Sequence, residues 1–134
     1  MINYKEFDSK LIESVKEILK KESWIAYLQD DEKLIRAFDN SLYILGAFDD
    51  NKLVGFVRCV GDGEHVLLVQ DIIVDKDYQQ RGIGTHLFKE IMQKYADVRM
   101  FFVLTDIEDE VNNKFYPSFG LKKLADNYMI GYIR

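Results

Sequence analysis

The sequence predicts an α/β fold: a mixed, mostly antiparallel sheet with a central parallel βαβ unit and helices on both faces. Residues 66–74 form a run that is apolar on both faces except at Gln70 and Asp71, which is typical of a strand covered on both sides. A second two-faced apolar run follows at 98–104, and the segment 87–95 between the two runs carries apolar residues at helical spacing. A helix that joins two covered strands predicts a parallel pair.

The N-terminal part is expected to supply one strand and two helices. Residues 2–7 could form a short first strand. Asp8 or Ser9 can cap a first helix, because their side chains can accept hydrogen bonds from unpaired N–H groups. Asp30 or Asp31 can cap a second helix in the same way. The first helix has its apolar positions at helical spacing, at Ile12, Val15, Ile18 and Leu19.

The remaining elements should complete the sheet. Residues 42–48 and 53–60 are apolar runs that a short polar turn separates, which predicts a hairpin. A shorter helix is expected over 108–116. Residues 121–124 and 128–133 are candidate closing strands, antiparallel by the same hairpin argument.

Bulk composition narrows the classes of protein. The 134 residues are enough for one domain, which we place at residues 1–134, and a net charge of −5 disfavours a nucleic-acid partner. No apolar run approaches the roughly 20 residues of a membrane span, and residues 1–6 do not resemble a signal peptide. A cytoplasmic location without membrane partners is therefore expected. Cys59 is the single cysteine, so no intrachain disulfide can form.

A glycine-containing turn separates the 66–74 run from the following helix. A glycine turn at a helix start leaves several backbone N–H groups without hydrogen-bond partners. Together with the helix dipole, these groups can bind a phosphate or pyrophosphate. The turn lacks the Gly-Lys-Ser/Thr of a Walker loop, and Leu87 stands where a dinucleotide fingerprint needs its third glycine. The glycines could also simply turn the chain. The turn reads Gln79, Gln80, Arg81, Gly82, Ile83, Gly84, Thr85.

The spacing Gln79-x-x-Gly82-x-Gly84 resembles the acyl-CoA signature of the GNAT superfamily of N-acetyltransferases. The resemblance covers roughly residues 41–124. It extends to three further segments, which resemble the family's central strand, the strand before it and a later Phe-Tyr…Gly segment: Asp71–Tyr78, Leu53–Phe56, and Phe115-Tyr116 with Phe119-Gly120-Leu121.

The resemblance implies acetyl-CoA as the acyl donor, with no metal. In this family the backbone of the central strand pairs with the pantetheine arm, which here implies Ile72, Ile73 and Val74. A backbone N–H near Ile72 would then donate a hydrogen bond to the oxyanion. The pyrophosphate would lie on the N–H groups of residues 81–85, with Arg81 adding charge. The full set of cofactor-binding candidates is Ile72, Ile73, Val74, Gln79, Gln80, Arg81, Gly82, Ile83, Gly84, Thr85 and Asn112.

Two side chains are candidates for the catalytic proton transfers. Tyr116 aligns with the family's usual general acid, although it could also be a core aromatic, and Pro117 after it disfavours helical geometry. Asp71 interrupts an apolar strand, and because burial raises the pKa of a carboxylate, it is a candidate base. It could also be a structural carboxylate. Glu64 and His65, at the start of the same strand, are rival bases.

Several other residues have two interpretations. Trp24, Tyr27 and Tyr43 could line an acceptor pocket or belong to the core. Arg58 lies in a predicted strand and could reach the acceptor or pair with Asp62. No His, Cys and Asp cluster has metal-ligand spacing.

The resemblance implies an enzyme that moves the acetyl group of acetyl-CoA directly to a primary amine, without a covalent enzyme intermediate. The acceptor would be a small molecule or a peptide amine, and a homodimer is possible. The alternative is a non-catalytic acyl-CoA-binding or regulatory module on the same fold, because fold does not imply function.

Overall fold

The computed structural model describes all residues from 1 to 134. The chain divides into two compact units, Met1–Val103 and Leu104–Arg134, which are described separately. Placement of all 134 residues in one domain therefore stays a prediction. None of the helices is long and apolar enough to cross a membrane.

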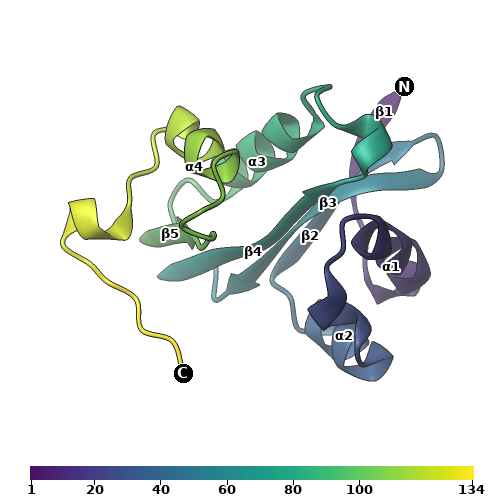
Figure 1. Ribbon diagram of the computed structural model, residues 1–134, viewed down its shortest axis with the longest axis horizontal. Helices are drawn as coiled ribbons and strands as arrows, with labels where there is room; N and C mark the ends of the chain where they lie inside the picture. Colours follow the sequence, from purple (N-terminus) through teal and green to yellow (C-terminus); the bar gives the residue numbers. More distant parts are fainter. The chain divides into compact units, whose positions relative to one another are not determined.

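The first unit contains a five-stranded sheet in the order β1-β2-β3-β4-β5 (Figure 1). Pairing is antiparallel from β1 to β4, and β4 pairs with β5 in parallel. This arrangement confirms the mixed, mostly antiparallel fold class. The strands are β1 (Ile2–Glu6), β2 (Tyr43–Asp49), β3 (Lys52–Gly61), β4 (Val66–Val74) and β5 (Met100–Val103).

Helices cover both faces of this sheet. Two of them lie on one face and α3 lies on the other (Figure 1). Asp30 caps α2, as expected. Asp8 caps the short 3-10 turn Ser9–Leu11 that leads into α1, whereas α1 itself starts after Leu11 without a side-chain cap. The helices are α1 (Ile12–Lys21), α2 (Asp31–Asp39) and α3 (Ile83–Lys94).

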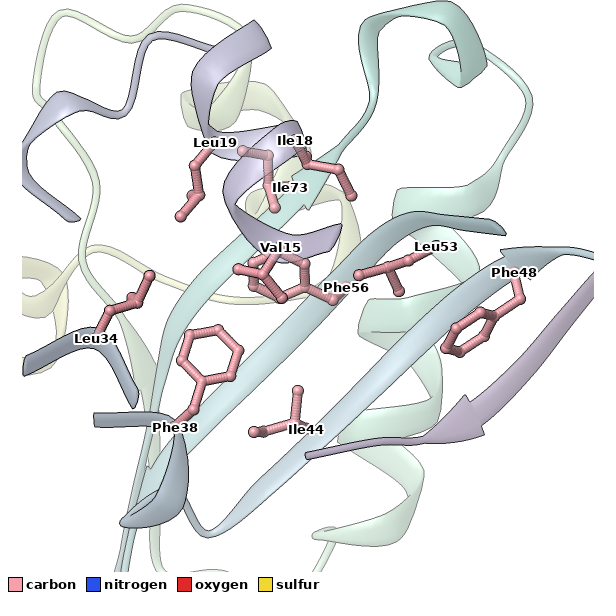
Figure 2. Packing of buried hydrophobic residues seen from close by; sticks show 10 residues of the cluster. All are labelled: Val15, Ile18, Leu19, Leu34, Phe38, Ile44, Phe48, Leu53, Phe56 and Ile73. Atoms are coloured by element: carbon pink, nitrogen blue, oxygen red, sulfur yellow. The ribbon is translucent and has the colours of Figure 1, made fainter. Parts of the chain in front are cut away.

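The main core lies between the sheet and the pair α1 and α2 (Figure 2). Phe56 of β3 and Phe38 of α2 meet in an edge-to-face contact, with ring centroids 5.8 Å apart. On the other face, Phe88 of α3 packs against Phe101 of β5. The main core consists of Val15, Ile18, Leu19, Leu34, Phe38, Ile44, Phe48, Leu53, Phe56 and Ile73.

Strand β4 changes its pairing halfway along its length. On one side Arg58 of β3 faces Asp71, but the next residue, Cys59, faces Val69, so Gln70 is an extra residue in a β-bulge. On the other side β4 pairs with β5 only over Val66–Val69. The backbone from Gln70 to Val74 therefore has no strand partner on the β5 side.

The second unit holds short helical turns only. The helix expected over 108–116 is present but shorter. The closing strands predicted at 121–124 and 128–133 are absent, so the prediction of those strands is wrong. A strand needs hydrogen bonds from a neighbouring strand, and the sheet ends at β5. The turns are α4 (Asn112–Phe115) and the 3-10 turns Pro117–Phe119 and Leu124–Asn127.

Candidate functional site

The glycine turn connects β4 to α3, as the sequence predicts. Gly82 is the N-cap of α3 and adopts the left-handed conformation, with φ +79°, and Gln80 before it has φ +63°. No side chain caps the helix, and the first backbone bond in it runs from the His86 N–H to the Gly82 carbonyl at 3.0 Å. The N–H groups of residues 83–85 therefore point out of the helix start without a capping side chain, as an anion site requires.

Side chains tie this turn to the end of β4. The Gln79 amide nitrogen donates to the Val74 carbonyl at 2.9 Å and to Glu22 at 3.1 Å. The Arg81 guanidinium donates to the Asp77 carbonyl at 3.2 Å and lies 4.9 Å from the centre of the Tyr78 ring. Arg81 thus remains an exposed cation at the turn, available to a phosphate.

We expect Gly82→Ala to weaken CoA binding on the order of tenfold, about 1.4 kcal/mol. An alanine is strained in the left-handed backbone of Gly82, which would cost on the order of 1 kcal/mol of stability and shift the helix start that carries the open N–H groups. Calorimetric titration with CoA measures the first effect. Gly120→Ala is the matched control, because Gly120 has φ +89° and, like Gly82, no atom within 4 Å of an added methyl group. Equal loss of affinity in both variants would refute a local role for the turn.

Asp71 is buried in β4, with 2% of its surface exposed, and both of its carboxylate oxygens are engaged. Arg58 Nε donates to one oxygen at 2.6 Å, and the Tyr27 hydroxyl donates to the other at 2.6 Å. Tyr27 itself is only partly buried. This pair of short bonds accounts for a carboxylate in an otherwise apolar strand.

Arg58 organises the surroundings of Asp71. Its guanidinium also donates to the Ser41 hydroxyl at 3.1 Å and to the Ala37 carbonyl at 3.4 Å. Burial alone would lower the pKa of Arg58, but the adjacent Asp71 outweighs burial and raises it. The alternative pairing with Asp62 is wrong, because Asp62 accepts from the backbone N–H groups of 64–66 instead.

Tyr27 joins this buried network to a surface hollow. Its oxygen also accepts hydrogen bonds from Gln70 Nε2 at 3.3 Å and Arg58 Nη2 at 3.4 Å. Burial and the neighbouring Asp71 raise the pKa of Tyr27, so its hydroxyl is protonated at neutral pH. The hollow has a volume of about 310 Å³ and is lined by Trp24, Ile25, Ala26 and Tyr27.

Other candidates lie away from this hollow. Tyr43 packs against Tyr95 on the α3 side, with ring centroids 6.1 Å apart, so it does not join Trp24 and Tyr27. Glu64 and His65 are exposed at the start of β4. Burial raises the pKa of Cys59 to about 12, as expected for an inert core thiol. No group of three or more His, Cys, Asp or Glu side chains could hold a metal ion.

Tyr116 and Asn112 belong to the second unit, at the two ends of the α4 turn. Tyr116 is helical, with φ −66° and ψ −44°, and its N–H donates to the Asn112 carbonyl at 3.1 Å. The expectation that Pro117 disfavours helical geometry is therefore wrong, and Pro117 instead begins a 3-10 turn. Burial, with a contribution from Asp109, raises the pKa of Tyr116 to about 12. Asn112 donates its side-chain amide to Asp109 at 2.8 Å.

Comparison with known proteins assigns the chain to a family. The acetyltransferase (GNAT) family matches residues 10–121. This chain belongs to that family. A GNAT-family acetyltransferase from Streptococcus pneumoniae TIGR4 is 32% identical, with a TM-score of 0.85 over 100% of this chain and 97% of that one.

Two further matches add information on fold and length. The PaiA N-acetyltransferase from Thermoplasma acidophilum, solved with coenzyme A, is 20% identical, with a TM-score of 0.76 over 91% of this chain and 90% of that one. It shares the fold. An uncharacterised ycf52-like N-acetyltransferase from Prochlorococcus marinus is 30% identical over 66 residues, which are 46% of this chain and 37% of that protein. The match thus spans little more than a third of that relative.

Sequence reasoning missed the network of Tyr27, Arg58 and Asp71. One signal was available: a cation interrupts the apolar strand 53–60, and an acid interrupts the apolar strand that follows it. Opposite charges in two adjacent apolar strands predict a buried pair when the strands are neighbours. The contribution of Tyr27 comes from a short turn between helices, and no periodicity could indicate it.

Proposed function

We propose that this GNAT chain is an N-acetyltransferase that moves the acetyl group of acetyl-CoA directly to a primary amine. The observation that carries the proposal is that two stretches of backbone without strand or cap partners follow each other along the chain. Residues 70–74 of β4 have no strand partner toward β5, and the chain then turns into the uncapped start of α3. The first stretch offers the hydrogen bonds of a strand edge, and the second offers N–H groups to a pyrophosphate.

The chain's residues fit an acyl-CoA in this arrangement. Ile72, Ile73 and Val74 would pair with the pantetheine amides, and an N–H near Ile72 would stabilise the oxyanion. Residues 79–85 would hold the pyrophosphate, with Arg81 adding charge. Asn112, on the second unit, is a further proposed contact. The bulge at Gln70 supports this assignment, because bulges redirect backbone groups next to active sites.

The amine would enter the hollow lined by residues 24–27. An ammonium must lose a proton before its nitrogen can attack, and we assign Asp71 as the acceptor of that proton. Tyr27 lies between the hollow and Asp71, so its oxygen would take the ammonium proton while its own hydroxyl proton passes to Asp71. The aromatic and aliphatic lining supports an amine with an apolar body.

Tyr116 is the proposed general acid. The amine nitrogen forms a bond to the thioester carbon, the carbon–sulfur bond breaks, and the departing thiolate takes the phenolic proton. The nitrogen gives up its extra proton as the amide forms, and that proton restores the Tyr116 phenol. A pKa of about 12 keeps the Tyr116 phenol protonated at neutral pH, so the donor is present when the thiolate forms. No enzyme nucleophile is required, and the buried Cys59 thiol does not supply one.

The direct test is calorimetric titration with acetyl-CoA, followed by CoA-thiol release against a panel of small and peptide amines. Micromolar binding with amine-dependent thiol release would establish the transferase. Binding without release for any amine would favour the non-catalytic acyl-CoA-binding module. Absence of binding would reject both, because the open edge of β4 and the glycine turn would then serve only the fold.

We expect Tyr27→Phe to lower kcat about tenfold while leaving the Kd for acetyl-CoA unchanged. The aromatic ring stays in the hollow, but the hydroxyl that links the amine to Asp71 is lost, and a water molecule can replace it only in part. Steady-state kinetics with the best amine of the panel measures the effect. Tyr43→Phe is the control, since Tyr43 packs on Tyr95 instead. An unchanged kcat in Tyr27→Phe would remove Tyr27 from the proton path.

A further inference from the structure

A buried carboxylate holds the connection between β4 and the glycine turn. Asp75 follows the last residue of β4 and is 2% exposed. Its Oδ1 accepts a hydrogen bond from the Asp77 N–H at 3.0 Å, so that its side chain caps the 3-10 turn Lys76–Tyr78. The Asp75 N–H donates to the Val54 carbonyl of β3 at 2.8 Å. Asp75 therefore helps to fix the direction in which the chain leaves the sheet.

The cation that pairs with Asp75 comes from the last turn of α1. Lys21 Nζ donates to the two carboxylate oxygens of Asp75, at 3.0 and 3.3 Å, and to Asp77 Oδ2 at 3.4 Å. Burial alone would raise the pKa of Asp75, but the Asp77 N–H and the Lys21 ammonium outweigh burial and lower it. Asp75 is therefore charged at neutral pH, and the ion pair joins two segments that lie 54 residues apart in the sequence.

Two further contacts bring the end of α1 to the same place. Glu22, directly after α1, accepts a hydrogen bond from the Gln79 amide at 3.1 Å. Ile18 and Leu19 share the main core with Ile73 of β4 (Figure 2). The end of α1 therefore contacts both the last part of β4 and the first residue of the glycine turn, which belong to the two stretches of backbone that we assign to acyl-CoA.

Given the proposed function, on which this inference rests, we propose that Lys21 and Asp75 are positioning residues for acyl-CoA. Their ion pair holds the glycine turn so that the N–H groups of residues 83–85 keep the orientation that receives the pyrophosphate. Neither side chain needs to contact the ligand, because Asp75 is buried and the Lys21 ammonium is bound to two carboxylates. A site that is ordered before its ligand arrives loses less conformational entropy on binding.

Calorimetric titration with CoA tests the proposal through two variants. Lys21→Met removes the cation, and Asp75→Asn places an amide donor against the Lys21 ammonium. Each should weaken CoA binding about tenfold, because each releases the connection that orients the turn. Charges that acted directly on the anionic ligand would give opposite signs, since loss of the ammonium would weaken binding and loss of the carboxylate would strengthen it. The double variant should lose no more affinity than the weaker-binding single variant, because the two residues act as one unit.

Two control variants and a second measurement separate positioning from a general loss of stability. Lys21→Arg keeps a cation and should bind CoA nearly as tightly as the wild type. Lys16→Met breaks another ion pair of α1, with Asp31, and should leave the Kd for CoA unchanged. Without ligand, the amides of residues 81–85 should exchange hydrogen faster in Lys21→Met than in Lys16→Met. In Lys21→Met the KM for acetyl-CoA should rise, while kcat at saturating acetyl-CoA stays near the wild-type value.

The outcomes that overturn the proposal are distinct from those that overturn the proposed function. Unchanged CoA affinity in Lys21→Met, or tighter binding by Asp75→Asn, would reject positioning by the ion pair and leave the proposed function intact. Weaker binding by Lys21→Met without faster exchange at residues 81–85 would also reject it. A wild type that binds no CoA would reject both. Should Asp75→Asn fail to fold, Lys21→Met still decides, because the Lys21 side chain is 40% exposed and circular dichroism checks its fold.

Discussion

Arg58→Met is expected to lower the free energy of unfolding by about 3–5 kcal/mol, because it leaves a buried carboxylate without its cation. Asp71 is 2% exposed, and Arg58 is its only charged hydrogen-bond donor, at 2.6 Å. Methionine fills much of the space of the arginine stem but offers no hydrogen-bond donor. Urea denaturation of the wild type and the variant measures the difference in unfolding free energy, provided that both unfold with the same m-value.

Two further variants show whether the buried charge is the cause. Arg58→Met combined with Asp71→Leu should be much less destabilised than the sum of the single changes, because the unpaired charge is then removed. Lys16→Met breaks the ion pair with Asp31, in which the Asp31 side chain is 55% exposed, and it should have a much smaller effect. An effect of Arg58→Met as small as that of Lys16→Met would show that the buried pair contributes little to stability.

Tyr116→Phe is expected to lower kcat about 10³-fold, within the range of general acid catalysis, with little change in the Kd for acetyl-CoA. Tyr116 is buried, with 7% of its surface exposed, and phenylalanine preserves its ring while removing the only proton it could donate. Steady-state and single-turnover thiol release measure the rate. Because the pKa of Tyr116 is about 12, the phenol loses its proton only as the pH rises through that value. The wild-type rate should therefore show no decline from Tyr116 ionisation between pH 6 and about pH 10.

The control for this change is Tyr128→Phe, which removes a hydroxyl from a fully exposed tyrosine of the same unit. It should keep the wild-type kcat. If Tyr116→Phe were as fast as the wild type, Tyr116 would be a core aromatic, and the thiolate would take its proton from elsewhere. If Tyr116→Phe lost acetyl-CoA affinity in proportion to kcat, its role would be in binding rather than in proton transfer.

Local patterns along the chain were enough to place the sheet and its helices. The run from Val66 to Val74 coincides with β4, and Asp30 caps α2 as its chemistry predicts. Hydrophobic periodicity and caps are properties of a few consecutive residues, so they can be recognised without long-range contacts. The same logic failed at residues 121–124 and 128–133, because a strand depends on a neighbour that no local pattern supplies.

The candidate site also has one part that the local sequence predicts and one part that depends on long-range contacts. The glycine turn from Gln79 to Thr85 is local, and its left-handed Gly82 follows from glycine chemistry. The partners of Asp71 depend instead on register. A bulge at Gln70 places Arg58 opposite Asp71, and the packing of a short turn brings Tyr27 to the other carboxylate oxygen. Consecutive residues therefore specified the glycine turn, whereas strand pairing and packing between distant segments specified the environment of the Asp71 carboxylate. The reason is that the partners of a buried charge are its neighbours in space and not its neighbours along the chain.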